Sequence, residues 1–200
     1  MLEFEHKLIA QGKTLIAGID EAGRGPLAGP VSCACVIMPL GEKDIIEGVN
    51  DSKKLSEKKR EELYDKIIEK AYSYSVVFVD EKTIDEVNIL NATKQGMIQC
   101  LEELSLKPEV VLVDAVKLNI ETENHGIIHG DALSYSIACA SILAKVERDR
   151  YMQSISARYQ NYNFAKHKGY GTKEHIQAIK QFGICEIHRK TFVKNFTNVS

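Results

Sequence analysis

Residues 16–25, IAGIDEAGRG, pass from an apolar run directly into two neighbouring acids and then into glycines that flank one arginine. The apolar residues predict a buried β-strand over Thr14–Asp20. An ionised carboxylate loses several kcal/mol of solvation when it is buried, so acids at the end of such a strand are normally solvated turn residues or metal ligands. Which of these Asp20 and Glu21 are depends on the other acids of the chain.

Two further apolar segments also lead into an acid. Residues 109–115, EVVLVDA, reach Asp114, and a short strand expected over Gly126–His129 leads into Asp131. For any one position a solvated strand end is the simpler explanation, but four converging carboxylates would repel one another unless Mg²⁺ or Mn²⁺ neutralised them. The repetition therefore favours a metal site, provided that the strand order brings these ends together. Its ligands would be Asp20, Glu21, Asp114 and Asp131.

The order of the apolar segments predicts an α/β fold with a mixed β-sheet. Further β-rich runs occupy Val31–Met38 and Ser75–Val79, and helical periodicity covers Ser56–Ala71, Thr83–Leu104 and Ala132–Tyr159. We expect a single domain, with a core over about residues 1–160 and a small helical extension over about residues 161–200. Short helices over Lys173–Phe182 and about Arg189–Asn195 would form the extension. Small residues at Ala138, Ser141 and Ala144 predict a helix that packs closely on the sheet.

The composition narrows the class of protein. An apolar fraction of 44% suits a chain with a substantial core, and a net charge of −2 is not the globally basic balance of many nucleic-acid binders, although local patches remain open. The five cysteines have no CxxC spacing, which favours reduced thiols over disulfides or a zinc site. The sequence contains no run of about 18 apolar residues and no basic, then apolar leader, so we expect a soluble, cytoplasmic protein without a membrane partner.

The glycine loop allows a second interpretation. Residues 23–28, GRGPLA, match the G-x-G-x-x-G/A fingerprint of dinucleotide-binding proteins. That fingerprint requires a helix to begin at the glycines, whereas a β-rich run follows Pro30 here. We therefore disfavour dinucleotide binding, although a tight turn with backbone N–H groups and Arg24 would still suit a phosphate.

Six segments resemble, in their order and spacing, the signature segments of bacterial ribonuclease HII. They are GIDEAGRGPLAGPV, DSKKLS, VDA, GDA, SIACASILAKVERDR and HKGYGTKEH, and the resemblance covers about residues 14–193. It implies a ribonuclease H-like fold and a metal-dependent endoribonuclease. The implied substrates are RNA–DNA hybrids and single ribonucleotides embedded in duplex DNA, cut to leave 5′-phosphate and 3′-hydroxyl ends. We expect the enzyme to act as a monomer.

By this resemblance, the four acids are the catalytic residues and hold two Mg²⁺ or Mn²⁺ ions, which would activate a water and stabilise the leaving oxygen. Gly23, Arg24 and Gly25 correspond to the family's glycine-arginine-glycine element, and Tyr170 corresponds to its junction-sensing tyrosine. Both elements would recognise the ribose, because only the 2′-hydroxyl distinguishes a ribonucleotide from a deoxyribonucleotide.

Basic residues near these motifs are candidates for phosphate contacts, which set register without reading sequence. The candidates are Lys53, Lys54, Lys166, His167, Lys168 and Lys173, and the basic track along the duplex would be extended by Arg189, Lys190 and Lys194. For a single lysine, a solvated surface position is the more common role. One residue departs from the family pattern: His129 precedes the GDA motif, where the family usually has lysine, which changes the local charge near Asp131.

Two alternatives bear on this interpretation. The related ribonuclease HIII type carries an extra N-terminal domain, for which a first strand near residue 14 leaves no room. A non-catalytic nucleic-acid binding module on the same fold is the other alternative. The intact acids argue against it, because a binder gains nothing from clustered negative charge beside phosphate.

Overall fold

The centre of the molecule is a mixed five-stranded sheet with the strand order β3-β2-β1-β4-β5. The structure is a computed structural model that describes residues 1–196. The strands are β1 (Ile16–Ala22), β2 (Val31–Ile37), β3 (Ser73–Val79), β4 (Val110–Asp114) and β5 (Glu123–Ile127). Neighbours β1 and β2, and β2 and β3, are antiparallel, whereas β4 runs parallel to both β1 and β5. The predicted α/β class with a mixed sheet is therefore confirmed.

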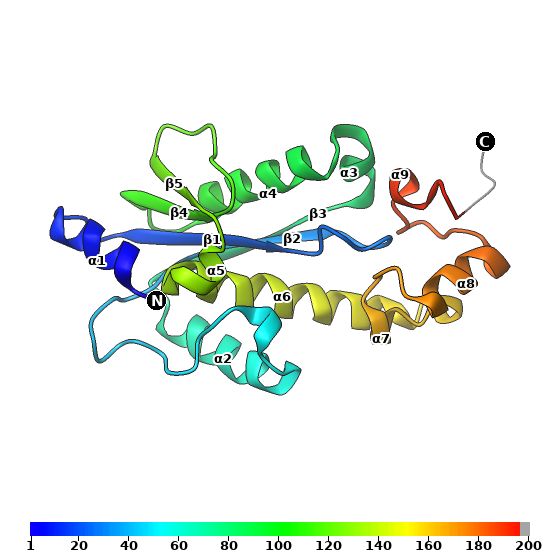
Figure 1. Cartoon of the computed structure of the whole chain (residues 1–200), viewed down its shortest axis with the longest axis horizontal. Coiled ribbons are helices and arrows are strands. Elements are labelled where there is room, and N and C mark those ends of the chain that lie inside the picture. The colour runs from blue at the N-terminus through cyan, green and yellow to red at the C-terminus, as the bar shows by residue number, and fades with distance from the viewer. Residues whose placement is uncertain (197–200) are drawn as a thin grey trace.

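Helices cover both faces of this sheet (Figure 1). They are α1 (Glu3–Ala10), α2 (Glu57–Lys70), α3 (Glu81–Val87), α4 (Ile89–Glu103), α5 (Gly130–Leu133), α6 (Tyr135–Ser156), α7 (Phe164–His167), α8 (Lys173–Phe182) and α9 (Lys190–Val193), with 3₁₀ turns η1 (Ser52–Lys54) and η2 (Gln160–Tyr162). Side chains alternate across a strand, so Cys33 and Cys35 of β2 pack under α4, while Ala34 and Val36 face α2 and α6. The described helices include none long and apolar enough to cross a bilayer.

The long helix α6 lies directly against β1, as its small residues predict. A Cβ on Gly18 would lie 2.1 Å from the backbone of Ser136, so only glycine permits this approach. Ala138 and Ala144 are fully buried in the same layer. This close packing holds β1 rigidly at the centre of the sheet, where its acids must be positioned.

Several elements differ from the sequence predictions. The single helix expected over Thr83–Leu104 is two helices, because Asn88 adopts a φ of 67° and its side chain caps α4. Similarly, Ser134 separates α5 from α6 and caps α6 through the Ile137 amide. The strand expected over Gly126–His129 is β5, which begins and ends earlier. Helix α1 has no counterpart among the predictions.

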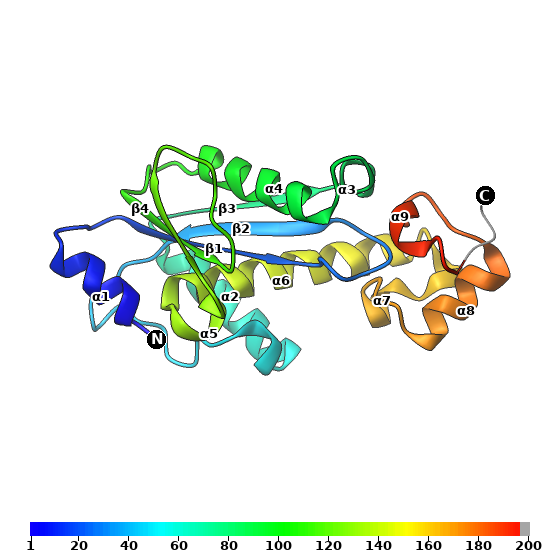
Figure 2. The same cartoon turned by 45° about the horizontal axis from the view of Figure 1, so that its top comes forward.

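The chain beyond α6 forms a group of short helices at one end of the molecule (Figure 2). We call residues 157–196 the C-terminal segment. The helix expected over Lys173–Phe182 is confirmed as α8, and α9 is shorter than the predicted helix over Arg189–Asn195. Residues 197–200 of the expected extension lie outside the described residues. Phe164 and Ile179 of this segment share a core with Leu27, which follows β1, so the segment packs against the glycine loop.

Candidate active site

The strand order brings two of the predicted acids next to each other. Strands β1 and β4 are parallel neighbours, so their carboxyl ends lie at the same edge of the sheet. Their register pairs Ile19 with Val113, which places Asp20 and Asp114 at adjacent positions one residue further along. Glu21 follows within β1, which ends at Ala22. The paired acids therefore lie inside the strand, whereas the sequence predicted a strand that ends at Asp20.

Asp131 joins this group through a tight turn. His129 adopts a left-handed conformation with a φ of 58°, and α5 begins at the next residue. The Gly130 amide donates a hydrogen bond of 2.7 Å to Asp114 Oδ1. This bond fixes the start of α5 beside β4, so that the charge of Asp131 acts on the carboxylate of Asp114.

Burial and neighbouring charge raise the pKa values of three of the acids. Asp20 is only 3% exposed, and its pKa is raised well above the ordinary value by burial and by the charges of Glu21 and Asp114. Burial also raises the pKa of Glu21, although Arg24 opposes the shift, and it raises the pKa of Asp114, with Asp131 adding to it. Clustered acids with raised pKa values in a cleft are typical of functional sites.

Two cationic side chains compensate part of this negative charge. Arg24 Nη1 lies 3.3 Å from Glu21 Oε1, and Lys53 Nζ lies 3.4 Å from Asp131 Oδ2. The donors are all carboxylate oxygens, which suits a hard divalent cation and not a soft metal. Within residues 1–196, no group of three or more His, Cys, Asp or Glu side chains is placed so that it could hold a metal ion as the side chains stand. The fit to a cation therefore rests on the donor type and on the excess of negative charge.

A pocket opens beside the acids and contains most of the predicted substrate-binding residues. Its lining consists of Glu21, Ala22, Gly23, Arg24, Gly25, Ser52, Lys53, Lys145 and Tyr170. The glycine loop, Lys53 and Tyr170 are thus brought together. Lys54 and Lys168 are not among the lining residues: Lys54 Nζ lies 3.8 Å from Asp51, and the Lys168 ammonium donates to the Ala165 carbonyl.

Lys145 is a pocket residue that the sequence analysis did not single out. Its ammonium lies 2.6 Å from Asp149 Oδ2, one helical turn further along α6. Burial lowers the pKa of Lys145, and Asp149 opposes that shift. The spacing of four residues between them was the available signal, but it predicts an ion pair and does not show that the lysine faces a pocket.

The prediction that Arg189 contacts phosphate is wrong. Its side chain is fully buried and donates to the carbonyls of Gly23 at 2.6 Å, Arg24 at 2.8 Å and Gly29 at 2.9 Å. A guanidinium whose N–H groups are engaged in this way is unavailable to a solvent-side ligand. Arg189 instead connects the C-terminal segment to the glycine loop.

Arg148 of α6 holds the same region from another side. It donates to the carbonyls of Pro30 at 2.9 Å, Lys168 at 3.0 Å and Ala28 at 3.2 Å. The loop after β1 and the loop that carries Tyr170 are therefore bonded to one side chain. Both parts of the pocket depend on this buried cation for their relative position.

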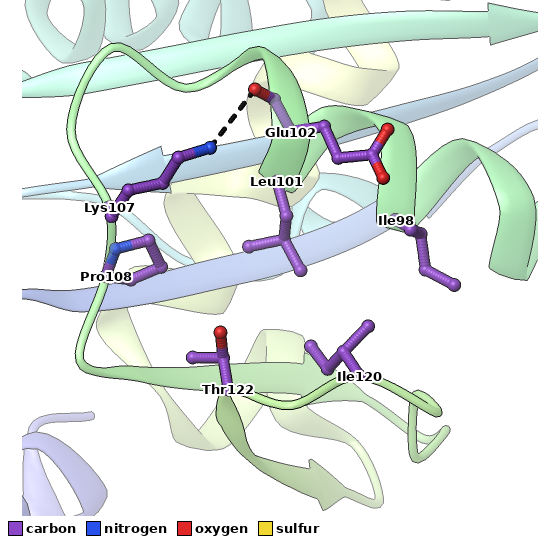
Figure 3. Close-up of a pocket in the computed structure, with 7 residues that line it drawn as sticks. All are labelled: Ile98, Leu101, Glu102, Lys107, Pro108, Ile120 and Thr122. Atoms are coloured by element: carbon purple, nitrogen blue, oxygen red, sulfur yellow. Dashed lines mark hydrogen bonds between the residues drawn. The ribbon is translucent and has the colours of Figure 1, made fainter.

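A separate pocket lies between the end of α4 and the segment that precedes β5 (Figure 3). Ile98, Leu101, Glu102, Lys107, Pro108, Ile120 and Thr122 line it. Lys107 Nζ donates to the Glu102 carbonyl at 3.3 Å, so its charge is directed at the helix end. This pocket contains none of the predicted site residues.

A mixed sheet whose central strand places acids beside those of its parallel neighbour is an α/β fold of the ribonuclease H-like kind. The Ribonuclease HII family model matches residues 17–198. The chain belongs to the ribonuclease HII family, and it is therefore an endoribonuclease of the ribonuclease H type.

Known proteins extend this assignment over nearly the whole chain. Ribonuclease HII of Ruminiclostridium cellulolyticum is 59% identical over 197 residues, which cover 98% of this chain and 76% of the relative. Ribonuclease H2 of Pyrococcus horikoshii superposes with a TM-score of 0.74 at 30% identity, covering 90% of this chain and 96% of that one. For ribonuclease HII of Archaeoglobus fulgidus, solved in a complex with PCNA, the TM-score is 0.77 at 27% identity, with coverages of 93% and 98%.

Proposed function

We propose that this chain cleaves RNA–DNA hybrids and single ribonucleotides embedded in duplex DNA, and that it leaves 5′-phosphate and 3′-hydroxyl ends. The observation that supports this most directly is the juxtaposition of four acids with a pocket lined by glycine backbone and a tyrosine. Acids alone would repel a phosphodiester, so the arrangement makes chemical sense only with cations between them and the substrate.

The ligands of the divalent cations are proposed to be Asp20, Glu21, Asp114 and Asp131, and the cations to be Mg²⁺ or Mn²⁺. Bound there, such ions stabilise negative charge at phosphorus and lower the pKa of a coordinated water. The protein supplies a rigid frame, since α6 holds β1 at Gly18 and the Gly130 amide holds Asp114. The raised pKa values of Asp20, Glu21 and Asp114 mean that protons compete with cations for these oxygens.

Recognition of the ribose is assigned to the backbone of Gly23–Gly25 and to Tyr170. A glycine backbone can approach a sugar edge because no Cβ intervenes, and a side chain at Gly25 would begin 3.9 Å from the Tyr170 ring. Tyr170 is exposed at the pocket, and the Arg148 guanidinium lies over its ring with Cζ 5.8 Å from the centroid. The opposite face of the ring is the one that would stack on a sugar. Replacement by Phe and by Ala separates the contribution of the hydroxyl from that of the ring.

Phosphate contacts are assigned first to Lys53 and Lys145, which line the pocket. Lys54 and Lys168 would contact the duplex only further from the acids. Such contacts position the substrate irrespective of sequence. The five cysteines are free thiols, which supports a reducing compartment such as the cytoplasm, and we propose that the chain acts there as a monomer.

The test is cleavage of a DNA duplex that carries one ribonucleotide and an end label, with an all-DNA duplex as the control. Cleavage 5′ to the ribonucleotide in Mg²⁺ or Mn²⁺, lost in chelator and in Asp20→Asn, supports the proposal. Tight binding without cleavage by the wild-type protein would instead support the non-catalytic binding module.

A further inference from the structure

Three buried histidines lie behind Tyr170 in the C-terminal segment. His167, His175 and His188 are 8%, 0% and 2% exposed. Their rings are in contact: the centroids of His167 and His175 are 4.6 Å apart, and those of His175 and His188 are 5.2 Å apart. None of them lines the pocket or approaches the acids, so the proposed chemistry leaves their clustering unexplained.

Hydrogen bonds define the tautomer of two of these rings. The Cys185 amide donates to His188 Nδ1 at 2.9 Å, and the Cys185 thiol also lies 3.1 Å from it. Nδ1 of His188 is therefore an acceptor, and its proton resides on Nε2. That Nε2 lies 3.0 Å from His175 Nε2, which must accept. The proton of His175 consequently resides on Nδ1.

His175 Nδ1 lies 2.9 Å from the carbonyl oxygen of Tyr170, to which it donates. A one-directional series of hydrogen bonds thus runs from the Cys185 amide through His188 and His175 to the Tyr170 carbonyl, and we call it the relay. The neighbouring ring adds a second connection, because His167 Nδ1 accepts from the Gly169 amide at 3.2 Å while its Nε2 donates to the Tyr162 carbonyl at 2.6 Å. The backbone on which Tyr170 sits is therefore held by imidazoles on two sides.

The relay requires the rings of His175 and His188 to be neutral. A second ring proton on His175 would place two N–H donors opposite each other between His175 and His188. A second ring proton on His188 would remove the acceptor of the Cys185 amide. Burial lowers the pKa of His175 and of His188, the latter to about 4, so the neutral forms are the stable ones near neutral pH. The thiol of Cys185 remains protonated as well, because burial raises its pKa to about 11.

We propose that His175 and His188 are positioning residues for Tyr170, and that this relay sets how well the enzyme recognises the sugar at the ribonucleotide junction. The inference rests on the proposed function, in which Tyr170 contacts that sugar. His175 of α8 and His188, in the turn before α9, would thus contribute to substrate discrimination without contacting the substrate.

The first experiment compares His175→Asn with His175→Leu. An asparagine amide can place an N–H donor near the position of Nδ1, whereas leucine has none. For a duplex with one ribonucleotide, we expect kcat/KM of the leucine variant to fall on the order of 10- to 100-fold, because a displaced positioning group costs rate at this scale. The asparagine variant should recover most of that loss. Equal losses in the two variants would overturn the proposal.

Ile179→Ala serves as the matched control, because Ile179 lies on the same helix, is 1% exposed and has an apolar side chain that makes none of the relay's hydrogen bonds. It should lower Tm at least as much as His175→Leu yet leave kcat/KM within about threefold below the unfolding temperature. If the control loses as much activity as His175→Leu, the histidine acts through stability alone and the inference is wrong.

A double-mutant cycle with Tyr170→Ala separates the inference from the proposed function. If His175 acts through Tyr170, His175→Leu has little further effect on kcat/KM in the Tyr170→Ala background. A full additional loss there refutes the relay, whereas failure of the wild-type protein to cleave refutes the proposed function. Independently of activity, nitrogen NMR of the wild-type histidines should show protons on Nδ1 of His175 and Nε2 of His188, and the opposite tautomers would overturn the assignment.

Discussion

Replacement of Gly23 by alanine tests how the glycine loop is held. Gly23 has a φ of 93°, and a Cβ there would lie 1.9 Å from Arg148 Nε, far inside contact distance. A left-handed conformation costs alanine about 1–2 kcal/mol. Moving the buried guanidinium breaks at least one charged hydrogen bond, for about 1.5–3 kcal/mol more. The free energy of unfolding should therefore fall by about 2.5–5 kcal/mol.

Two other glycines separate these contributions. Gly12 has a φ of 87°, and a Cβ at this position would have no neighbour within 4 Å, so Gly12→Ala should show the conformational cost alone. Gly25 has no positive φ, and its Cβ would meet only Tyr170 at 3.9 Å. Gly25→Ala should leave stability within about 0.5 kcal/mol but reduce cleavage of the ribonucleotide duplex, because the methyl group enters the pocket.

Urea unfolding of the three variants, followed by circular dichroism at 25 °C, measures the differences directly. The clash with Arg148 predicts that Gly23→Ala loses clearly more stability than Gly12→Ala. If the free energies of unfolding of the two variants fall by the same amount within about 0.5 kcal/mol, then displacement of the Arg148 side chain does not destabilise the fold. The reasoning that this side chain fixes the loop would then be refuted.

Three further predictions concern charge. Asp20→Asn should abolish cleavage and yet raise Tm by a few degrees in chelator, because it removes one of several mutually repelling buried carboxylates; a lowered Tm would contradict the electrostatic account. In the folded protein the pKa of His188 is lowered to about 4 from 6.5. Its neutral form therefore contributes stability that is fully present above about pH 6.5. This contribution is at most about 3 kcal/mol, and it is lost as the pH falls toward 4. The titratable groups that face it are His175, His167, Cys185 and Tyr162. Urea unfolding at pH 7, 5.5 and 4.5 should show a shallower pH dependence for His188→Gln than for the wild-type chain. Lys53→Ala should weaken substrate binding and reduce the slope of log binding constant against log salt by about one, whereas an unchanged slope would place Lys53 away from phosphate.

Local patterns in the sequence were sufficient for the strands and for most of the helices. Hydrophobic periodicity and composition indicate which side chains are buried, so the runs around Ile19, Val36 and Val113 predict strands correctly. Helix α2 begins where the helical periodicity starts, and Ser56 caps it there, since its hydroxyl accepts from the Lys59 amide. The paired acids of β1 and the repeated acids after apolar runs indicated a charged site, and a long motif resemblance indicated the family.

Contacts between distant residues could not be read in this way. Arg189 looks like a surface cation in the sequence, but it is buried against the carbonyl of Gly23, 166 positions away. The break at Asn88 depends on a backbone conformation that side-chain periodicity does not reveal. Likewise, the single proton that each relay histidine carries is determined by its partners in space, above all the Cys185 amide.

The amino-acid sequence by itself therefore determined the strands and most of the helices, and it indicated which side chains are candidates for the chemistry, because burial and backbone preference are largely local properties. Only the tertiary structure decided that Asp20 and Asp114 are neighbours, because their meeting requires β1 and β4 to be parallel partners in one register. The same holds for the pocket, whose shape depends on buried cations that satisfy carbonyls contributed by remote parts of the chain.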